Sequence, residues 1–294
     1  MSRFSFLLVA AAILPFSVQA APNIDIETAA QIYQDAAIRE QVRASLGAMP
    51  DHIRQLVVGY TSSSLSDAQL AAITAAAKRG FRIDVFEAPA LSALAANLDS
   101  DTAKKAAVFL SGDVGKRMVA ADVAVANLEE EKLDKIMKGE ITAPSTPQRD
   151  ALFVKLEAAS RSTESTVQIF LSMGTAVGMG VAIGSGLDPG PVEERARKSA
   201  EATRADLEKS MREPMRRYMA YDYRDFSEAD LKHMLEYLQS SAGRRYVSAY
   251  IASIGAGFDA MGRRCGEQLG DSLRELAIAQ LATEGAGAKP KDQK

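Results

Sequence analysis

The sequence has very few of the residues that build disulfides, metal centres and aromatic-rich sheets. Among its 294 residues, one is cysteine, two are histidine and none is tryptophan, and aromatic residues make up 6%. The single cysteine, Cys265, excludes an internal disulfide. His52 and His233 lie far apart, with no cysteine pair or H-E-x-x-H motif near them. We therefore expect neither a metal centre nor another cofactor.

Charge is also too dispersed for a nucleic-acid-binding surface. The formal net charge is −3, and lysine and arginine are scattered along the chain. A protein that binds nucleic acid needs a basic stripe to neutralise phosphates. We expect no nucleic-acid partner.

Sequence motifs of catalysis and nucleotide binding are either absent or have the wrong spacing. A G-x-S-x-G nucleophile motif is absent. Residues 112–116 have two residues between their glycines where a phosphate-binding loop needs four, and Arg117 replaces the required Ser or Thr. Residues 178–184 are one residue too long for a dinucleotide fingerprint. These failures favour a protein that is not an enzyme. The alternative is a hydrolase with carboxylates dispersed in sequence, for which Asp222, Asp225 and Glu228 are the first candidates.

The first residues have the three-part pattern of a secretory signal peptide. Arg3 precedes an apolar run at residues 4–18, and Val18-Gln19-Ala20 supplies the small and branched residues of a cleavage site. This run is shorter than the roughly 20 residues of a spanning helix. We expect residues 1–20 to be removed near Ala20. At the other end, residues 285–294 read GAGAKPKDQK and are expected to form a disordered tail.

The remaining composition predicts an all-α fold. Alanine is abundant, and the residues that strands prefer are few. Apolar residues at helical spacing predict a helix over residues 26–49. Ser66 and Gln69 form a capping-box pattern, which predicts a helix that ends near Gly80. Pro89 marks another helix start, and Pro191 suits the first turn of the helix after a sharp turn.

Two prolines in residues 141–148 predict a linker between helical halves at 21–140 and 149–284. Each half contains one copy of a repeated pattern. Residues 98–124 resemble residues 226–252 when shifted by 128 positions, and each copy predicts a capped helix, a short break and a second helix. The matching pairs are Lys104 and Lys232, Leu110 and Leu238, Gly115 and Gly243, Arg117 and Arg245, Val119 and Val247, Ala121 and Ala249, and Ala124 and Ala252.

The second copy also resembles a known family. Phe226-Ser-Glu-Ala-Asp-Leu231 and Tyr237-Leu-Gln-Ser-Ser-Ala-Gly243 are similar to the domain of unknown function 2059, whose pattern is F-[ST]-x-x-[DE]-L and then F-Y-x-S-P-x-G. Ser241 stands where the family usually has proline, and Leu238 where it has tyrosine. The resemblance covers residues 226–250, with a fainter echo at 98–121. It implies a helical fold and export to a Gram-negative periplasm, and it implies no activity.

The residues of this motif have a structural interpretation. Ser227 is placed to cap a helix whose third residue is Asp230, and Leu231 begins the buried stripe of that helix. Ser240 is placed to cap the next helix, and Gly243 lets two helices approach closely. Phe226 and Tyr237 complete the motif. We expect a helical hairpin over residues 226–282 rather than a binding site.

An uncharged, glycine-rich segment, residues 167–187, has two interpretations. It contains G-x-x-x-G spacings and is about long enough to span a bilayer. Its hydropathy is mild because serine, threonine and Gln168 interrupt it, which favours a buried core helix over a membrane anchor. For Cys265, burial on a helix is the simpler expectation, and a thiol activated by Arg263 and Arg264 is the alternative.

By elimination, the sequence predicts an exported periplasmic protein with a binding or structural role among protein partners of the cell envelope. The alternative is an envelope protein held at the inner membrane by residues 167–187. The sequence does not indicate an oligomeric state.

Overall fold

The computed structural model describes residues 23–47, 49–51, 53–54 and 66–287, and in this part of the chain helices are joined by turns without any strand. The predicted all-α fold is confirmed. The predicted signal peptide and residues 288–294 lie outside the described residues, and the last helix includes residues 285–287. The helices are α1 (Ile26–Asp35), α2 (Ile38–Leu46), α4 (Asp67–Gly80), α5 (Ile83–Asn97), α6 (Ser100–Ser111), α7 (Asp113–Ala126), α8 (Glu130–Lys138), α9 (Pro147–Ser160), α10 (Ser162–Gly184), α11 (Gly190–Asp222), α12 (Glu228–Gln239) and α13 (Ser241–Gly287).

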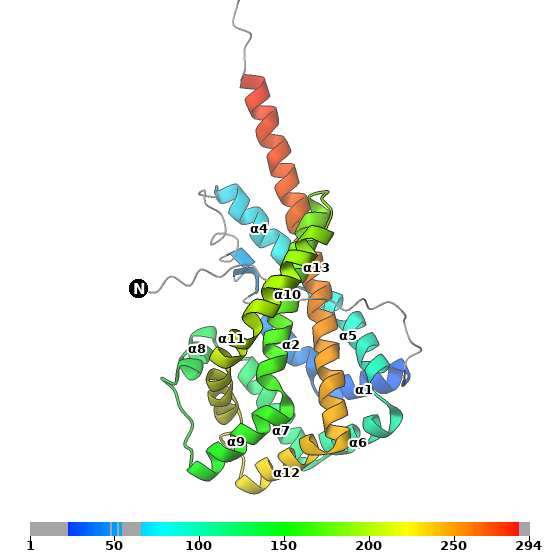
Figure 1. Ribbon diagram of the computed structural model, residues 1–294, viewed down its shortest axis with the longest axis vertical. Coiled ribbons are helices and arrows are strands. Elements are labelled where there is room, and N and C mark those ends of the chain that lie inside the picture. Colours follow the sequence, from blue (N-terminus) through cyan, green and yellow to red (C-terminus); the bar gives the residue numbers. More distant parts are fainter. Residues whose placement is uncertain (1–22, 48, 52, 55–65, 288–294) are drawn as a thin grey trace, which may run out of the picture.

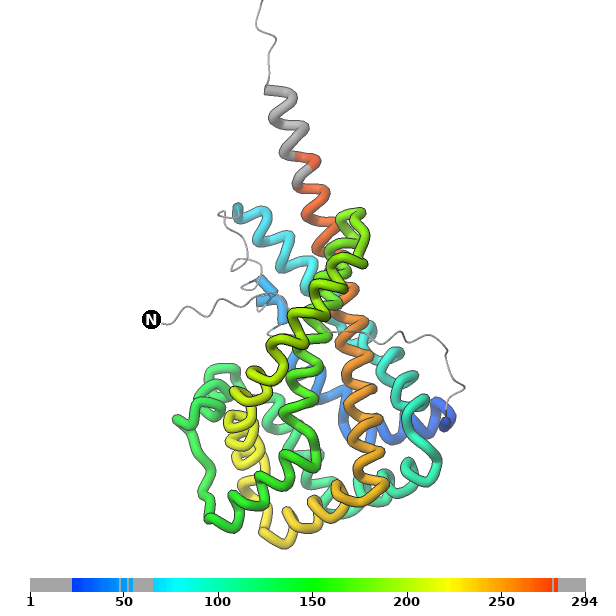
Figure 2. The backbone as a smooth tube through the Cα atoms, viewed as in Figure 1, coloured from blue at the N-terminus to red at the C-terminus, as the bar shows by residue number. Residues whose placement is uncertain are grey.

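The 47-residue helix α13 is the element around which the others are arranged. It packs against α10, α5, α4 and α6 (Figure 1). The tube in Figure 2 shows α10 running beside α13 and α11 returning along the opposite direction. One end of α13 continues past the turn that joins α10 to α11 (Figure 1).

Helices α10 and α13 touch along a line of glycines, which we call the glycine seam: Gly180 and Gly184 on α10, and Gly262, Gly266 and Gly270 on α13. Gly262 lies against Met173, Gly266 against Val177, and Gly270 against Val181, so the two helices run parallel. A Cβ atom on Gly180, Gly184, Gly266 or Gly270 would overlap a carbonyl oxygen of the facing helix. The absence of side chains at the seam therefore lets the two backbones meet directly.

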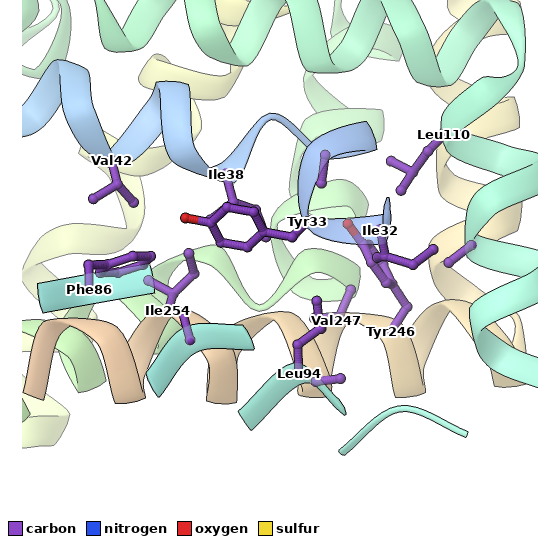
Figure 3. Close-up of a cluster of buried hydrophobic side chains, with 14 of the residues drawn as sticks. Ile32, Tyr33, Ile38, Val42, Phe86, Leu94, Leu110, Tyr246, Val247 and Ile254 are labelled. Atoms are coloured by element: carbon purple, nitrogen blue, oxygen red, sulfur yellow. The ribbon is translucent and has the colours of Figure 1, made fainter. Parts of the chain in front are cut away.

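Apolar side chains of α1, α2, α5, α6 and α13 form the core (Figure 3). Figure 3 labels ten of them: Ile32, Tyr33, Ile38, Val42, Phe86, Leu94, Leu110, Tyr246, Val247 and Ile254. The same buried cluster includes Leu156 of α9 and Leu231 of α12. The cluster therefore includes residues from before and after the predicted linker 141–148. Most of this linker lies in the loop between α8 and α9.

Helix boundaries follow local signals where a cap is present. Ser66 forms the predicted capping box with Gln69, and α4 ends at Gly80. Pro191 lies in the first turn of α11 as predicted. These residues determine the helix ends through hydrogen bonds and φ angles that depend on neighbouring residues alone.

Two predicted boundaries are wrong. The helix expected over residues 26–49 is broken at Ala37, whose φ of 48° is left-handed and lets the core side chains of both α1 and α2 be buried. Pro89 lies inside α5 rather than at its start. Packing against α13 holds α5 together there, and Ser253 donates a buried hydrogen bond of 2.8 Å to the Ala90 carbonyl. In both places tertiary packing overrides the local preference.

Candidate functional site

Residues of the sequence motif cap and join α12 and α13. The Asp230 backbone N–H donates to Ser227 Oγ over 3.1 Å, and the Ser227 N–H donates to Asp230 Oδ2 over 2.9 Å. Ser240 Oγ accepts from the Gly243 N–H over 2.9 Å at the start of α13. A Cβ on Gly243 would overlap the Tyr237 carbonyl oxygen, so the tight break between these helices requires glycine.

The hairpin of α6 and α7 has the same local geometry 128 positions earlier. Asp99 caps α6 by accepting from the Thr102 N–H over 2.8 Å. Gly112 occupies the break with φ −70° and ψ 165°, close to the φ −64° and ψ 161° of Ser240. A Cβ on Gly115 would overlap the Phe109 carbonyl oxygen. Residues 112–116, which superficially resemble a phosphate-binding loop, therefore form the break at Gly112 and the first turn of α7.

The two hairpins contact each other through side chains at equivalent positions. The Phe109 and Tyr237 rings stack with centroids 4.0 Å apart and planes 7° apart. Arg117 donates to Asp230, with an N–O distance of 2.5 Å, and Arg245 donates to Thr102 Oγ1 over 2.9 Å. Arg245 lies 128 positions after Arg117, and Thr102 lies 128 positions before Asp230, so the two pairs occupy equivalent positions with the hairpins exchanged. Each hairpin therefore uses equivalent residues to contact the other. Such an arrangement is called isologous when it relates two subunits, and here it lies within one chain.

Arg117→Ala is expected to raise the pH at which the protein unfolds in acid. Hydrogen bonds from Arg117 and then Ser227 hold the pKa of Asp230 well below its usual value. Because the folded-state pKa is the lower one, ionised Asp230 stabilises the fold above about pH 4, and this stabilisation is lost as the pH falls toward the folded pKa. Without Arg117 the loss begins at a higher pH.

Circular dichroism during an acid titration measures that shift. Lys116→Ala is the control because it removes an exposed positive charge next to Arg117. We expect Lys116→Ala to leave the acid midpoint unchanged. Equal shifts in the two variants would assign the effect to net charge and contradict a specific role for the Arg117–Asp230 pair.

The turn between α11 and α12, residues 223–227, is held from two other helices. The Arg149 guanidinium of α9 donates to the carbonyl oxygens of Phe226 and Tyr223, the latter over 3.1 Å. The Tyr223 hydroxyl donates to Asp122 Oδ1 of α7 over 2.8 Å. The Phe226 ring is buried against Tyr223, with the Arg117 guanidinium above it at 5.1 Å. The turn therefore has partners for both its carbonyl oxygens and its side chains.

Two carboxyl groups meet at this turn. Asp222, the last residue of α11, is 5% exposed, and its carboxyl group lies within hydrogen-bonding reach of Asp122. Burial, followed by the proximity of Asp122, raises the pKa of Asp222 well above its usual range. Burial also raises the pKa of Asp122 by a smaller amount, because the hydrogen bond from Tyr223 opposes it. Two carboxyl groups in such close proximity repel each other when both are ionised, which favours a proton on one of them.

The other carboxylates proposed from the sequence lie apart from this pair. Asp225 is exposed and lies 3.6 Å from Arg224, and Glu228 lies 3.6 Å from Lys232. The structure therefore brings Asp222 to Asp122, which sequence reasoning missed. The available signal was an acidic residue on the apolar stripe of α7, three positions from both Val119 and Val125.

The structure also shows the surroundings of the histidine and cysteine candidates. The described residues contain no group of three or more His, Cys, Asp or Glu side chains that could hold a metal ion. His233 packs near the Phe109 ring, and His52 lies outside the described residues. Cys265 is fully buried against Gly80, and burial raises its thiol pKa to about 12, which contradicts the activated-thiol alternative.

Comparison with protein-family models, curated proteins and solved structures finds no match for this chain. The resemblance to the domain of unknown function 2059 therefore rests on the motif residues themselves.

Proposed function

We propose that this protein is exported to the periplasm and acts by binding other proteins of the cell envelope rather than by catalysis. The observation that carries the proposal is the contrast between its interior and its surface. In the part of the chain that the structure describes, the carboxyl pair of Asp122 and Asp222 lines neither of two shallow surface hollows, which lie at α4 and at the start of α13. Chemistry on a substrate needs a site that the substrate can enter.

The end of the molecule where α13 passes the α10–α11 turn is the proposed partner-binding surface. Leu187, which follows α10, is 66% exposed, and Ile278 of α13 is 61% exposed. Ile183 in the last turn of α10 is also exposed. Gly184 lies against Asp271, so the end of α10 adjoins α13 about two helical turns before Ile278. Exposed apolar side chains on adjacent helices are a feature of protein-binding surfaces.

A photo-crosslinking residue at Leu187 or Ile278 is expected to capture a partner protein in intact cells. Val108 of α6 is the matched control, because it is 73% exposed but lies on a different helix of the main body. We expect adducts at Leu187 and Ile278 and none at Val108. Equal capture at all three positions, or no capture at any, would contradict the proposed surface.

The packing of α10 supports a core helix rather than a membrane anchor. In the described residues, α10 is the one helix long and apolar enough to cross a membrane by length and composition, and half of its most apolar window is buried. Its Gly180 and Gly184 already contact α13. We expect osmotic shock to release the protein from cells. Retention through a high-pH membrane wash would instead support the inner-membrane alternative.

The geometry of the two hairpins supports the family resemblance and an internal duplication. All seven motif residues, Phe226, Ser227, Asp230, Leu231, Tyr237, Ser240 and Gly243, are capping, buried or closely packed. The reciprocal contacts of Arg117 and Arg245 favour descent from one hairpin that once paired with a second copy of itself. This part of the proposal implies helix packing and no activity.

The carboxyl pair favours a second candidate, a hydrolase that uses Asp222 as an acid and Asp122 as a base. Acid–base enzymes often contain two carboxyl groups whose pKa values differ. Loss of an enzymatic activity in both Asp222→Asn and Asp122→Asn, with folding retained, would support it. Activity that survives in both variants would end it.

A further inference from the structure

Among the described residues, no element packed around the carboxyl pair supplies it with a positively charged partner. Tyr218, Asp222 and Tyr223 of the α11 end, Asp122 of α7 and Tyr250 of α13 are the titratable groups that act on one another there. The positive charge of Arg224 lowers the pKa of Asp222, but the Arg224 guanidinium donates to the Tyr221 carbonyl oxygen and pairs with Asp225. Arg149 is bonded to backbone carbonyls of the turn. In the described part of the chain, neither carboxyl group forms a salt bridge.

The hydrogen bonds around the pair require a proton. Asp222 Oδ1 is buried and has no donor within reach. A buried carboxylate oxygen without a donor is costly, whereas the carbonyl oxygen of a neutral carboxylic acid tolerates it better. The other oxygen of Asp222 can then donate its proton to Asp122, whose carboxylate also accepts from the Tyr223 hydroxyl over 2.8 Å. One proton thus gives both side chains a consistent set of bonds.

We propose that Asp122 and Asp222 form a proton-binding site that fastens the end of α11 to α7, and that loss of the shared proton releases the turn at residues 223–227. The site takes a proton rather than a metal ion or an organic ligand. Its role is conformational: the carboxylate of Asp122 holds Tyr223, and the neutral acid of Asp222 lets the two carboxyl groups remain in contact. Two ionised carboxylates in contact would repel each other.

The direction of the pH effect follows from the raised pKa values of both groups. The folded state keeps its proton to a higher pH than the unfolded or locally opened state does. The stabilisation is therefore complete below about pH 4, the ordinary carboxyl pKa, and is lost as the pH rises through the raised folded-state pKa. This is opposite in sign to the effect of Asp230, which weakens the fold in acid.

Hydrogen–deuterium exchange at the amides of residues 219–226 tests the release. If the closed turn binds one proton more than the opened turn, the equilibrium constant for opening rises by up to about tenfold per pH unit between about pH 6 and pH 9. This constant is obtained from the exchange rates after correction for intrinsic exchange. Asp222→Asn keeps an amide that can donate to Asp122 but cannot ionise, so its opening constant is expected to be independent of pH. Asp225→Asn, a neutralised carboxylate in the same turn, is the control and should keep the wild-type slope.

Infrared spectroscopy of the wild-type protein provides a test that does not depend on any variant folding. A protonated-carboxyl C=O band is expected at neutral pH, and it should disappear as the pH rises in step with the exchange data. The band should persist in Asp225→Asn and be absent in Asp222→Asn. A wild-type spectrum without this band at neutral pH would overturn the proposal, as would a wild-type slope of exchange in Asp222→Asn.

Discussion

Replacing Gly266 with alanine is expected to destabilise the protein by about 3 kcal/mol or more, although only one methyl group is added. The new Cβ would overlap the Val177 carbonyl oxygen and lie 2.8 Å from the Val181 nitrogen. Both atoms belong to the α10 backbone, which cannot change rotamer to make room. The helices must separate, and the seam and the side chains packed around it separate with them. Chemical denaturation followed by circular dichroism measures the effect.

Two other glycines on the same helices provide matched controls. Gly174 on α10 and Gly255 on α13 have open space where a Cβ would lie. Alanine at either position is expected to stabilise the protein by about 0.5–1 kcal/mol, because glycine is a poor helix former. Equal effects at Gly255 and Gly266 would contradict direct backbone contact at the glycine seam.

Gly243→Leu is expected to destabilise the C-terminal hairpin by about 1–3 kcal/mol or more through overpacking. The Cβ atom of the new side chain would overlap the Tyr237 carbonyl oxygen and lie 2.8 Å from the Leu238 Cα atom. Because Gly115 lies in the same position against Phe109, Gly115→Leu should have a similar effect. The denaturation midpoint of each variant measures this.

Gly255→Leu is the control for this second experiment, since it places the same side chain on α13 where no atom lies within 4 Å of the Cβ. An unchanged midpoint in Gly243→Leu would show that the break between α12 and α13 tolerates a side chain. A large effect at Gly243 and none at Gly115 would contradict the equivalence of the two hairpins.

Features that depend on a few neighbouring residues could be predicted from the sequence. The caps at Ser66, Ser227 and Ser240 are present because each oxygen bonds an amide three residues later. The all-α class follows from composition in the same way. These are short-range interactions, and the sequence contains everything that determines them.

Features that depend on distant residues could not be predicted in this way. Asp122 and Asp222 are 100 positions apart, and neither is flanked by a motif that indicates a partner. Ala37 has a left-handed φ, which the sequence does not indicate because the residue is neither glycine nor asparagine. This φ results from the packing of α1 and α2 into one core. Of the two G-x-x-x-G spacings in residues 167–187, Gly180 and Gly184 make the close helix contact that such a spacing indicates, whereas Gly174 has open space around it. The identity of the partner helix, α13, became evident only from the fold.

The position of α13 after the helices that it packs against determines when those helices can be covered. Its residues are synthesised after those of α4, α5, α6 and α10, all of which pack against it. The seam pairs residues 89 positions apart, as with Val177 and Gly266. These four helices therefore keep apolar faces uncovered until α13 has been synthesised. Such an order of assembly delays compaction and leaves apolar surface open to aggregation during that interval.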